Sequence, residues 1–524
     1  MTTTLSEHMY ERRWWTLGVL CLSLMVISVD NTILNVALPS IVKDLGAKGS
    51  ELQWIIDSYT IVFAGLLLTA GSLGDRFGRK KALTAGLVLF ATFSVFASFA
   101  TSPGMLIAAR GLMGIGGALI FPTTLSILTN TFVGRERAKA IGIWAGVSGL
   151  GIVIGPLGGG LLLEHFSWGS VFLVNVPICA TAIVLGIFFV PDSRDPAEGQ
   201  LDPFGAVLSI IGLTSLLYAI IEAPDKGWGS PNVLVGFVFG AIFIGGFFAW
   251  ELHTSHPMLD IRFFKNPRFS AASATITLTY FALFGSTFLL TQYFQFVLGY
   301  SPLKAGMMTA PVAIGIMVCA PQAPKLVDRF GTKKVVAGGL LVVAFSLCLY
   351  TSDTIMSSIV LGAIARILFG AGMGFTIAPA TESIMGSLPP AKAGVGSAVN
   401  DTTRQTGGAL GVAVIGSVFA ARFHSVVGSA TQVPDSARAA VKDSIGAALD
   451  AARNLPAADQ ATIRAVVDHA YLVSMRLAYL LAAGVILLAA TVTWRYLPAH
   501  APDEGEEDVE TEAALSDAVP VTTG

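Results

Sequence analysis

Three charged residues interrupt long apolar segments in the first quarter of the chain, and their types and spacing suit proton transfer. Asp30, Asp57 and Arg110 each lie inside a run of apolar residues. At about 1.5 Å per helical residue, all three reach a similar depth of roughly 9–12 Å from the ends of those runs. An isolated charge there costs at least about 2.5 kcal/mol, so these groups are expected to pair or to face water. A buried carboxylate that gains and loses a cationic partner has the movable pKa that proton coupling requires.

The same residues also have a purely structural interpretation, in which Arg110 and one of the two aspartates form a fixed ion pair. Further charges interrupt apolar segments later in the chain: Glu222, Arg366, Glu382, Asp401, Arg404 and Arg476. For most of these, a satisfied structural pair or an interfacial position is as good an interpretation as contact with a ligand. Arg366 is expected to anchor the second half of the chain.

A repeated pair of motifs indicates how these segments are organised. Asp-Arg-Phe-Gly-x-Lys-Lys occurs at Asp75–Lys81 and again at Asp328–Lys334. About 35 residues later, each copy is followed by Ala-Arg-x-Leu-x-Gly-x-Gly, at Ala109–Gly116 and Ala365–Gly372. Two motifs in the same order at a nearly constant offset indicate a duplicated helical bundle. Secondary transporters are built in this way, with a site between the halves.

The first copy of the basic loop combines small, acidic and basic residues: Gly71, Gly74, Asp75, Arg76, Gly78, Arg79 and Lys80. Gly71 and Gly74 leave the helix surface bare, so that a neighbouring helix can approach closely. Asp75 and the basic cluster can then make or break charged contacts at a helix end, which suits a latch between two states. A simple anchor on the inner face would explain the lysines and arginines but not the Asp and the glycines.

A stripe of small residues occupies the predicted helix at 140–163. It begins with Gly142 and Gly146 and continues through Gly151, Gly155, Pro156 and Gly159. Small residues one turn apart favour tight helix packing, and Pro156 removes one backbone hydrogen bond and permits a bend. Ordinary packing between membrane helices is the alternative interpretation.

The composition excludes an ordinary soluble protein. Mean hydropathy is +0.70, and only 13% of the residues are charged, against about 25% in soluble domains. Apolar runs of about 20 residues recur along the chain, each long enough to cross a bilayer. The first, Trp14–Leu38, is too long for a signal peptide and has no small-residue cleavage site after it. The four cysteines lie in apolar runs without metal-ligand spacing, which favours a packing role.

We therefore predict an all-α integral membrane protein with fourteen spanning helices. They are expected at 14–38, 52–74, 82–101, 104–129, 140–163, 170–190, 203–222, 232–252, 269–297, 305–326, 335–352, 355–386, 397–421 and 472–495. Most of the lysines and arginines fall in loops on one side, so the positive-inside rule places both termini in the cytoplasm.

The repeat aligns the first six helices with the last six and leaves 203–222 and 232–252 as an inserted hairpin. The predicted units are a cytoplasmic N-terminus (1–13), a six-helix bundle (14–190), a linker with the hairpin (191–268), a second six-helix bundle (269–498) and an acidic tail (499–524). The second bundle includes an outer loop at 424–470, in which Ala437–Ala452 is expected to form a short amphipathic helix. The tail is expected to be disordered because it is acidic and has little apolar surface.

At these residues the chain resembles the major facilitator superfamily, specifically its fourteen-helix drug:proton antiporter branch. The resemblance extends from about Trp14 to Pro498 and is carried by Val29–Pro39, Gln53–Tyr59, Gly71–Lys81, Arg110–Gly117, Gly142–Gly160 and Phe172–Pro177. The second basic loop departs from the pattern, with Val327 and Thr332 where the first has Gly74 and Arg79.

The resemblance implies two six-helix bundles plus the inserted hairpin and a role in exporting amphipathic or cationic drugs in exchange for protons. Asp30 and Asp57 would serve cation recognition and proton coupling, and Arg110 would assist proton transfer. Gly71–Lys81 would gate the inner side, and Gly151–Gly160 looks like the signature of exporters in this superfamily. The candidate site for proton coupling and substrate binding also includes three further polar residues: Asn31, Tyr59 and Glu222.

The expected partners are a small amphipathic substrate, protons and the lipid bilayer of the cell membrane. We expect no cofactor, no nucleic acid and a monomer. Export of an endogenous lipid, amino acid or secondary metabolite is the alternative function. An enzyme is not expected, because the sequence has no Gly-x-x-x-x-Gly-Lys-Ser/Thr, His-Glu-x-x-His or Gly-x-Ser-x-Gly motif.

Overall fold

The structure is a computed structural model that describes residues 11–46, 49–194, 202–254, 257, 259, 261–352, 358–389, 392–430 and 455–498. Within these ranges every regular element is a helix, as the all-α prediction requires. The expected short helix at 437–452 and the acidic tail at 499–524 lie outside the described residues.

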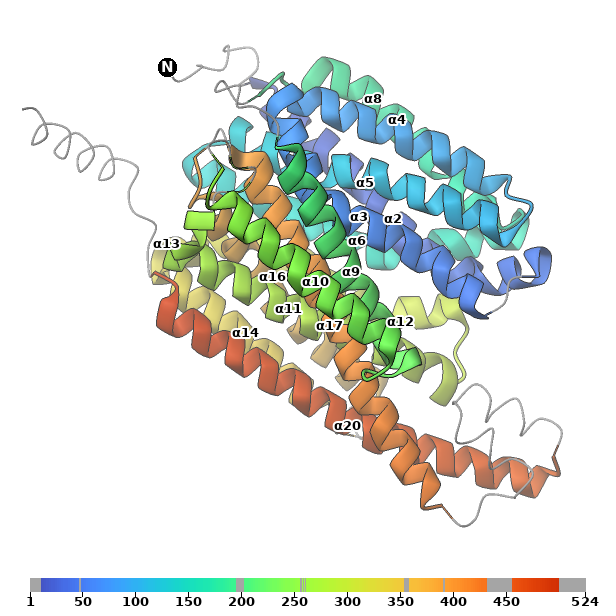
Figure 1. Cartoon of the computed structure of the whole chain (residues 1–524). Coiled ribbons are helices and arrows are strands. Elements are labelled where there is room, and N and C mark those ends of the chain that lie inside the picture. Colours follow the sequence, from blue (N-terminus) through green and yellow to red (C-terminus); the bar gives the residue numbers. More distant parts are fainter. Residues whose placement is uncertain are drawn as a thin grey trace, which may run out of the picture.

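The first six predicted spans form one set of packed helices (Figure 1). They are α2 (Arg13–Leu45), α3 (Gly49–Phe77), α4 (Arg79–Ser98), α5 (Pro103–Thr131), α6 (Gly134–His165) and the nearly continuous pair α7 (Ser170–Leu173) and α8 (Asn175–Phe189). Helices α3 and α4 pack on α5, and α2 packs on α6 and α8. The start of α5 is fixed locally, because the Ser102 hydroxyl accepts the backbone N–H of Met105 at 3.3 Å and a proline follows at the first helical position.

The last six predicted spans form a second set. They are α11 (Pro267–Gln292) with the π-helical turn η2 (Tyr293–Val297), α12 (Pro302–Cys319) with η3 (Ala320–Gln322) and α13 (Ala323–Phe330), α14 (Thr332–Tyr350), α16 (Ile359–Met385), α17 (Ala393–Gly428) and α20 (Ala457–Tyr496). The predicted helix at 305–326 is interrupted because Pro321 and Pro324 have no N–H to donate to the preceding turn. Helix α11 packs on α17 and α20, while α16 packs on α12 and α14.

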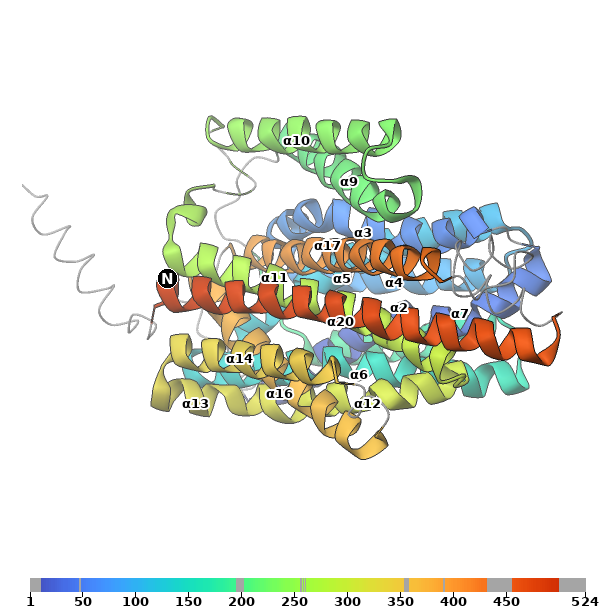
Figure 2. The same ribbon diagram turned by 90° about the horizontal axis from the view of Figure 1, so that it is seen from below.

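The inserted hairpin consists of α9 (Pro203–Lys226) and α10 (Pro231–Glu251), which pack on each other. A short 3₁₀ turn, η1 (Ile261–Lys265), then leads into α11. Figure 2 shows the hairpin at one edge of the molecule, where α9 contacts α3 and α17 and α10 lies outermost. The hairpin is therefore attached to both sets of helices.

Length and composition make most of these helices membrane spans. Thirteen helices among the described residues are long and apolar enough to cross a bilayer. Helix α6, which corresponds to the remaining predicted span, has 32 residues, or about 48 Å. Large apolar side chains cover the outside of the molecule, with Phe188 69%, Ile242 62% and Val360 68% exposed. Such an apolar surface fits lipid and not water, so the chain is a multi-pass membrane protein.

The boundaries of the outer loop predicted at 424–470 need correction. Helix α17 continues to Gly428, and α20 already begins at Ala457. The first turns of α20 bury Ile463 and Val467 completely or nearly so, and the hydroxyl of Tyr471 donates to the carbonyl of Leu289 at 2.6 Å. Packing on the end of α11 therefore extends α20 beyond its strongly apolar stretch, which the apolar pattern alone did not reveal.

Candidate functional site

Asp30 is the central acceptor of a buried polar cluster between α2, α5 and α8. Its side chain is fully buried. Arg110 on α5 donates from Nη1 to Asp30 Oδ2, forming a buried ion pair. Asn175, the first residue of α8, donates from Nδ2 to Asp30 Oδ1 at 2.9 Å and lies 3.3 Å from the hydroxyl of Ser94. Both carboxylate oxygens of Asp30 are thus held by donors from other helices.

Arg110 is fixed on its second side by α3. Its Nε donates to the carbonyl of Ile55 at 3.2 Å, and its guanidinium lies 4.4 Å from the centroid of the Tyr59 ring. Tyr59 is 1% exposed and stacks on Phe63 at 5.6 Å. A cation over an aromatic face is stabilised by the ring quadrupole, most strongly where water is excluded. The Tyr59 ring therefore helps to hold Arg110 in place beside the Asp30 carboxylate.

The structure brings only some of the predicted site residues together. Of the two aspartates expected near Arg110, Asp30 is its ion-pair partner. Asp57 lies on α3, two residues after Ile55, whose carbonyl accepts from Arg110. The Asp57 side chain is partly exposed and is not among the hydrogen-bond partners of Arg110. Asn31 has an exposed side chain on α2. Asn175, in contrast, was not predicted as a site residue, although an amide inside the apolar run 170–190 was a usable signal.

Two acids form ion pairs at helix ends, one within a helix and one between α2 and α6. Glu222, predicted to belong to the candidate site, pairs with Lys226 on the same helix at 2.6 Å, and no hydrogen bond or ion pair among the described residues joins it to the Asp30 cluster. Glu136 accepts from Arg13 at 2.7 and 2.8 Å. This hydrogen-bonded guanidinium holds the pKa of the Glu136 carboxyl below its usual value.

The basic loop after α3 joins the two halves. Asp75 accepts from Arg79 at 2.7 Å and from the backbone N–H groups of Gly394 and Val395 at 3.0 and 3.1 Å, at the first turn of α17. Placing a carboxylate on a helix N-terminus satisfies orphan donors and the helix dipole together. A Cβ at Gly71 would lie 2.6 Å from the carbonyl of Gly394, so a side chain there would separate the helices. These contacts join the loop that carries the predicted latch to the first turn of α17.

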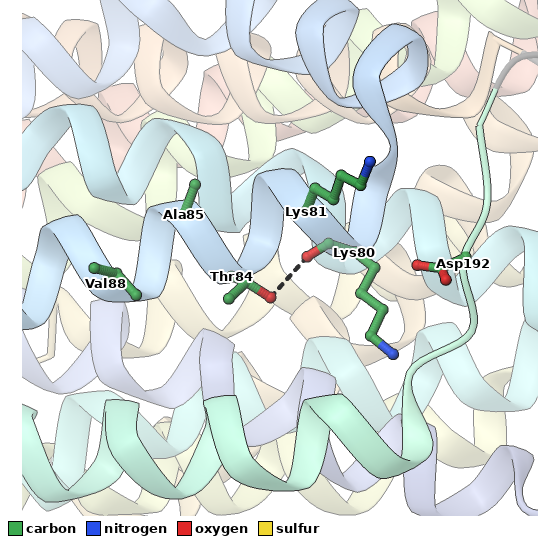
Figure 3. A pocket seen from close by; sticks show the side chains of 6 residues that line it. All are labelled: Lys80, Lys81, Thr84, Ala85, Val88 and Asp192. Carbon is green, nitrogen blue, oxygen red and sulfur yellow. Dashed lines mark hydrogen bonds between the residues drawn. The ribbon is translucent and has the colours of Figure 1, made fainter.

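The remaining members of the loop shape its backbone and surface. Gly78 has φ of 106°, which favours glycine, and a Cβ at Gly74 would lie 3.0 Å from a methyl group of Thr123. The guanidinium of Arg76 lies 5.5 Å from the centroid of the Phe77 ring. Lys80 lines a shallow depression of about 450 Å³ (Figure 3), and its Nζ donates to the carbonyl of Ile187 at 3.0 Å. The residues lining this depression are Lys80, Lys81, Thr84, Ala85, Val88 and Asp192.

The same end of the molecule holds two further ion pairs between the halves. Arg137 on α6 donates to Glu382 on α16 at 2.8 Å, with both side chains 19% exposed. The second copy of the basic motif contributes Asp328, which lies 3.5 Å from Arg135 but is 45% exposed, whereas Asp75 is 6% exposed. The second loop therefore lacks the buried carboxylate of the first, in keeping with its altered sequence.

The glycine stripe of α6 faces α2 on either side of the buried carboxylate. A Cβ at Gly155 would lie 1.9 Å from Thr32 Oγ1, and one at Gly151 would lie 2.3 Å from Ser28 Cβ. The Thr32 hydroxyl donates to the carbonyl of Gly151 at 2.7 Å. A Cβ at Gly159 would meet the next turn of α2 at 2.8 Å. The stripe therefore sets how closely α6 approaches the helix that carries Asp30.

An earlier part of α6 contacts the other half instead. A Cβ at Gly142 would lie 2.6 Å from the carbonyl of Ala320, and one at Gly146 would lie 3.3 Å from Met317 Cα. The helix continues without a break through Pro156. Glycines on one helix thus provide close packing both within the first half and across the interface.

A second buried charge lies where the halves meet. Arg404 on α17 has its guanidinium 4.6 Å from the ring centroid of Tyr280, 5.1 Å from that of Phe121 and 5.4 Å from that of Trp144. The predicted partner Asp401 is 3.7 Å away, too far for a hydrogen bond. Phe121 and Trp144 belong to the first half and Tyr280 to the second, so rings from both halves surround one cation.

Comparisons with known proteins agree with this architecture. Residues 20–412 match the Major Facilitator Superfamily. The chain is 36% identical to the multidrug efflux pump LfrA of Mycolicibacterium smegmatis, over 92% of this chain and 95% of the relative. It is 33% identical to the tetracenomycin C resistance and export protein of Streptomyces glaucescens, over 92% and 91%.

A solved structure supports the fold independently of sequence. The human organic anion transporter MFSD10 (TETRAN) superposes with a TM-score of 0.62 at 14% identity, over 92% of this chain and 99% of that protein. At this identity the likeness concerns the fold alone. The family match, the relatives and the paired helical halves lead to one assignment: the chain belongs to the Major Facilitator Superfamily and is a transporter, not an enzyme.

Proposed function

We propose that this protein is a proton-coupled antiporter that exports amphipathic, often cationic compounds from the cytoplasm by alternating access. The observation that carries the proposal is the buried Asp30–Arg110 pair, a carboxylate neutralised by one arginine inside the first half. Multidrug and antibiotic export by the relatives, as their names state, supports the cargo class. The coupling ion is the proton, and no cofactor is required.

The charge balance of the pair suggests how a proton displaces cargo. While Asp30 is ionised, its charge and that of Arg110 cancel. A proton on Asp30 leaves Arg110 as a net positive charge. A cationic cargo about 8 Å away is then disfavoured by about 2 kcal/mol at an effective dielectric constant of 20, or roughly 30-fold in affinity. Proton entry therefore lowers the affinity for cations, as an antiporter requires.

Aromatic rings from both halves also surround a cation at the interface. The guanidinium of Arg404 lies 4.6–5.4 Å from three ring centroids, two of them in the first half and one in the second. A guanidinium desolvated against such rings is stabilised by about 2 kcal/mol. Rocking of the halves changes the spacing of these rings and so links the environment of Arg404 to the conformational state.

Alternating access requires an end that opens and closes. The contacts of Asp75 with α17 and of Arg137 with Glu382 close one end of the interface. We assign this end to the cytoplasm, because the basic loops gather there and the positive-inside rule then places both termini inside. The protein works as a monomer in the cell membrane. Asp57 provides a second titratable carboxylate, with Asn31 and Tyr59 beside the Asp30 cluster.

The test is efflux from proteoliposomes with an imposed pH gradient, comparing wild type with Asp30→Asn and Asp57→Asn. Ethidium serves as the cationic probe. We expect gradient-driven efflux by wild type and its loss in Asp30→Asn. Equal efflux by wild type after the pH gradient and voltage are both collapsed would disprove proton coupling.

Export of an endogenous product is the second candidate function. It is favoured by a Streptomyces relative named for tetracenomycin C resistance and export. Metabolite profiling of a deletion strain separates the two candidates: a compound that accumulates inside the cell and competes with ethidium in proteoliposomes identifies an endogenous cargo. Drug sensitivity without such accumulation favours drug export.

A further inference from the structure

Arg366 on α16 is a buried cation that has no carboxylate partner within the described part of the chain. Its side chain lies in the interior of the second half, with the residue only 3% exposed. Among the described residues it forms no ion pair, and its Nε has no hydrogen-bond acceptor. Burying an unpaired charge is unfavourable in any apolar interior, and especially within a membrane. A group of this kind points to a missing anionic partner.

Its counterpart in the first half is Arg110, which occupies the same position of the repeat and does have hydrogen-bond and ion-pair partners. Arg110 and Arg366 are the second residues of the two repeated Ala-Arg-x-Leu-x-Gly-x-Gly motifs, and each is the eighth residue of its helix. Arg110 donates to Asp30 and to the carbonyl of Ile55. The duplicated bundle has therefore kept the cation but not the acid, and the second half must neutralise it differently.

The surroundings of Arg366 supply an aromatic face and hydroxyl groups. Its guanidinium lies 5.3 Å from the ring centroid of Phe294, in the π-helical turn that ends α11. The side chains of Tyr350, Tyr479 and Tyr300 are its neighbours. The rings of Tyr350 on α14 and Tyr479 on α20 are 5.5 Å apart. Three helical elements and the connection at Tyr300 thus surround one cation, and none of these side chains brings a negative charge at neutral pH.

One of these hydroxyls is also unsatisfied. Tyr350 is 2% exposed, and its Oη forms no close hydrogen bond among the described residues. Its polar neighbour is Ser346, one turn earlier in α14, which directs its own hydroxyl to the carbonyl of Ala365 at 2.7 Å. The hydroxyl of Tyr479 is already used, since it donates to the carbonyl of Ser286 at 3.3 Å. A guanidinium whose Nε lacks an acceptor and a phenol without a close acceptor form a donor set for an anion.

We propose that Arg366 and Tyr350 form a binding site for a small monovalent anion, either a halide or a carboxylate group, in the second half of the protein. The occupant must be small because both side chains are almost completely buried. A bound anion neutralises the arginine and ties α14 to α16. Anion binding at this site requires neither proton coupling nor drug transport, so a test of the proposed function does not decide whether the site exists.

Thermal unfolding of the purified full-length protein in detergent tests the site. Sodium gluconate, whose anion is too large to enter, is replaced stepwise by chloride, bromide or formate at constant ionic strength. We expect the Tm of wild type to rise by at least about 3 °C when the anion reaches 100 times its Kd, because ligands that bind only the folded state stabilise it. A lower half-saturation for formate than for chloride identifies a carboxylate as the preferred group, and the reverse order identifies a halide.

Substitutions assign the effect to the site. Arg366→Gln should abolish the anion-dependent rise, and Tyr350→Phe should raise the half-saturating concentration several-fold. Arg135→Gln is the matched control, because Arg135 is 86% exposed and should leave the anion response intact. Chloride line broadening by NMR measures binding directly.

Three results would overturn the proposal: no anion response in wild type, a full response in Arg366→Gln, or an unchanged half-saturation in Tyr350→Phe. The third criterion decides the matter if Arg366→Gln does not fold.

Discussion

Replacing Asp30 by Asn should separate proton coupling from the rest of the transport cycle. Asn has the same shape as Asp but no charge, so packing between α2, α5 and α8 is retained. Arg110, 1% exposed, would lose its only ion-pair partner among the described residues. Removing one partner of a buried pair destabilises a protein by about 3–5 kcal/mol, because the other charge stays buried and unpaired.

This reasoning predicts a compensating double substitution. Asp30→Asn alone should lower the midpoint of thermal unfolding. Adding Arg110→Gln should recover most of that loss, because both charges are then absent. Proton-driven ethidium efflux should be absent from both variants, since neither has a carboxyl at position 30. Asp44→Asn is the matched control, because Asp44 is an exposed aspartate on the same helix.

The assays are thermal unfolding in detergent, pH-driven efflux from proteoliposomes and exchange of labelled for unlabelled cargo without a gradient. Exchange requires only binding and rocking, so it should survive in the double variant. Proton-driven efflux by Asp30→Asn at the wild-type rate would remove Asp30 from the mechanism. Equal stability of Asp30→Asn and wild type would refute the energetic argument for the pair.

Three further predictions concern the latch, the glycine stripe and pH. Asp75→Asn weakens the charge-assisted hydrogen bonds to the first turn of α17. A cysteine introduced in that turn should therefore react several-fold faster with a water-soluble maleimide. An unchanged labelling rate would rule out the latch. Gly155→Val should lower the unfolding free energy by about 1–3 kcal/mol through overpacking. Gly158→Val on the same helix is the control and should leave it unchanged, because a Cβ there meets nothing within 4 Å. Similar Tm values for the two variants would contradict the packing argument. Because Arg13 lowers the folded-state pKa of Glu136, their pair stabilises the protein above the unfolded pKa of about 4.3, and this contribution is lost as the pH falls through the folded pKa. Acid unfolding should therefore be less steep in Glu136→Gln, and identical acid profiles would show that the pair contributes nothing.

The sequence determined the architecture almost by itself. Lipid leaves backbone groups no partner other than their own helix, so each long apolar run had to become a helix, and the repeated motifs revealed the duplication. The helix ends were less predictable. Prolines interrupt the segment at 305–326, and packing against the end of α11 extends α20 to Ala457. Neither effect follows from apolar periodicity alone.

The candidate site required the tertiary structure. Sequence showed that Asp30, Asp57 and Arg110 lie at similar depth, but depth does not specify which helix faces point at one another. In the packed bundle, α2 presents Asp30 to Arg110 and Asn175 and presents Ser28 and Thr32 to the glycine stripe of α6. The same limit applies in the second half, where only the fold shows that Arg366 is buried among aromatic side chains and has no acid beside it within the described ranges. Charge type and depth are properties of one helix, whereas pairing depends on how several helices are turned, and only the packed bundle fixes that.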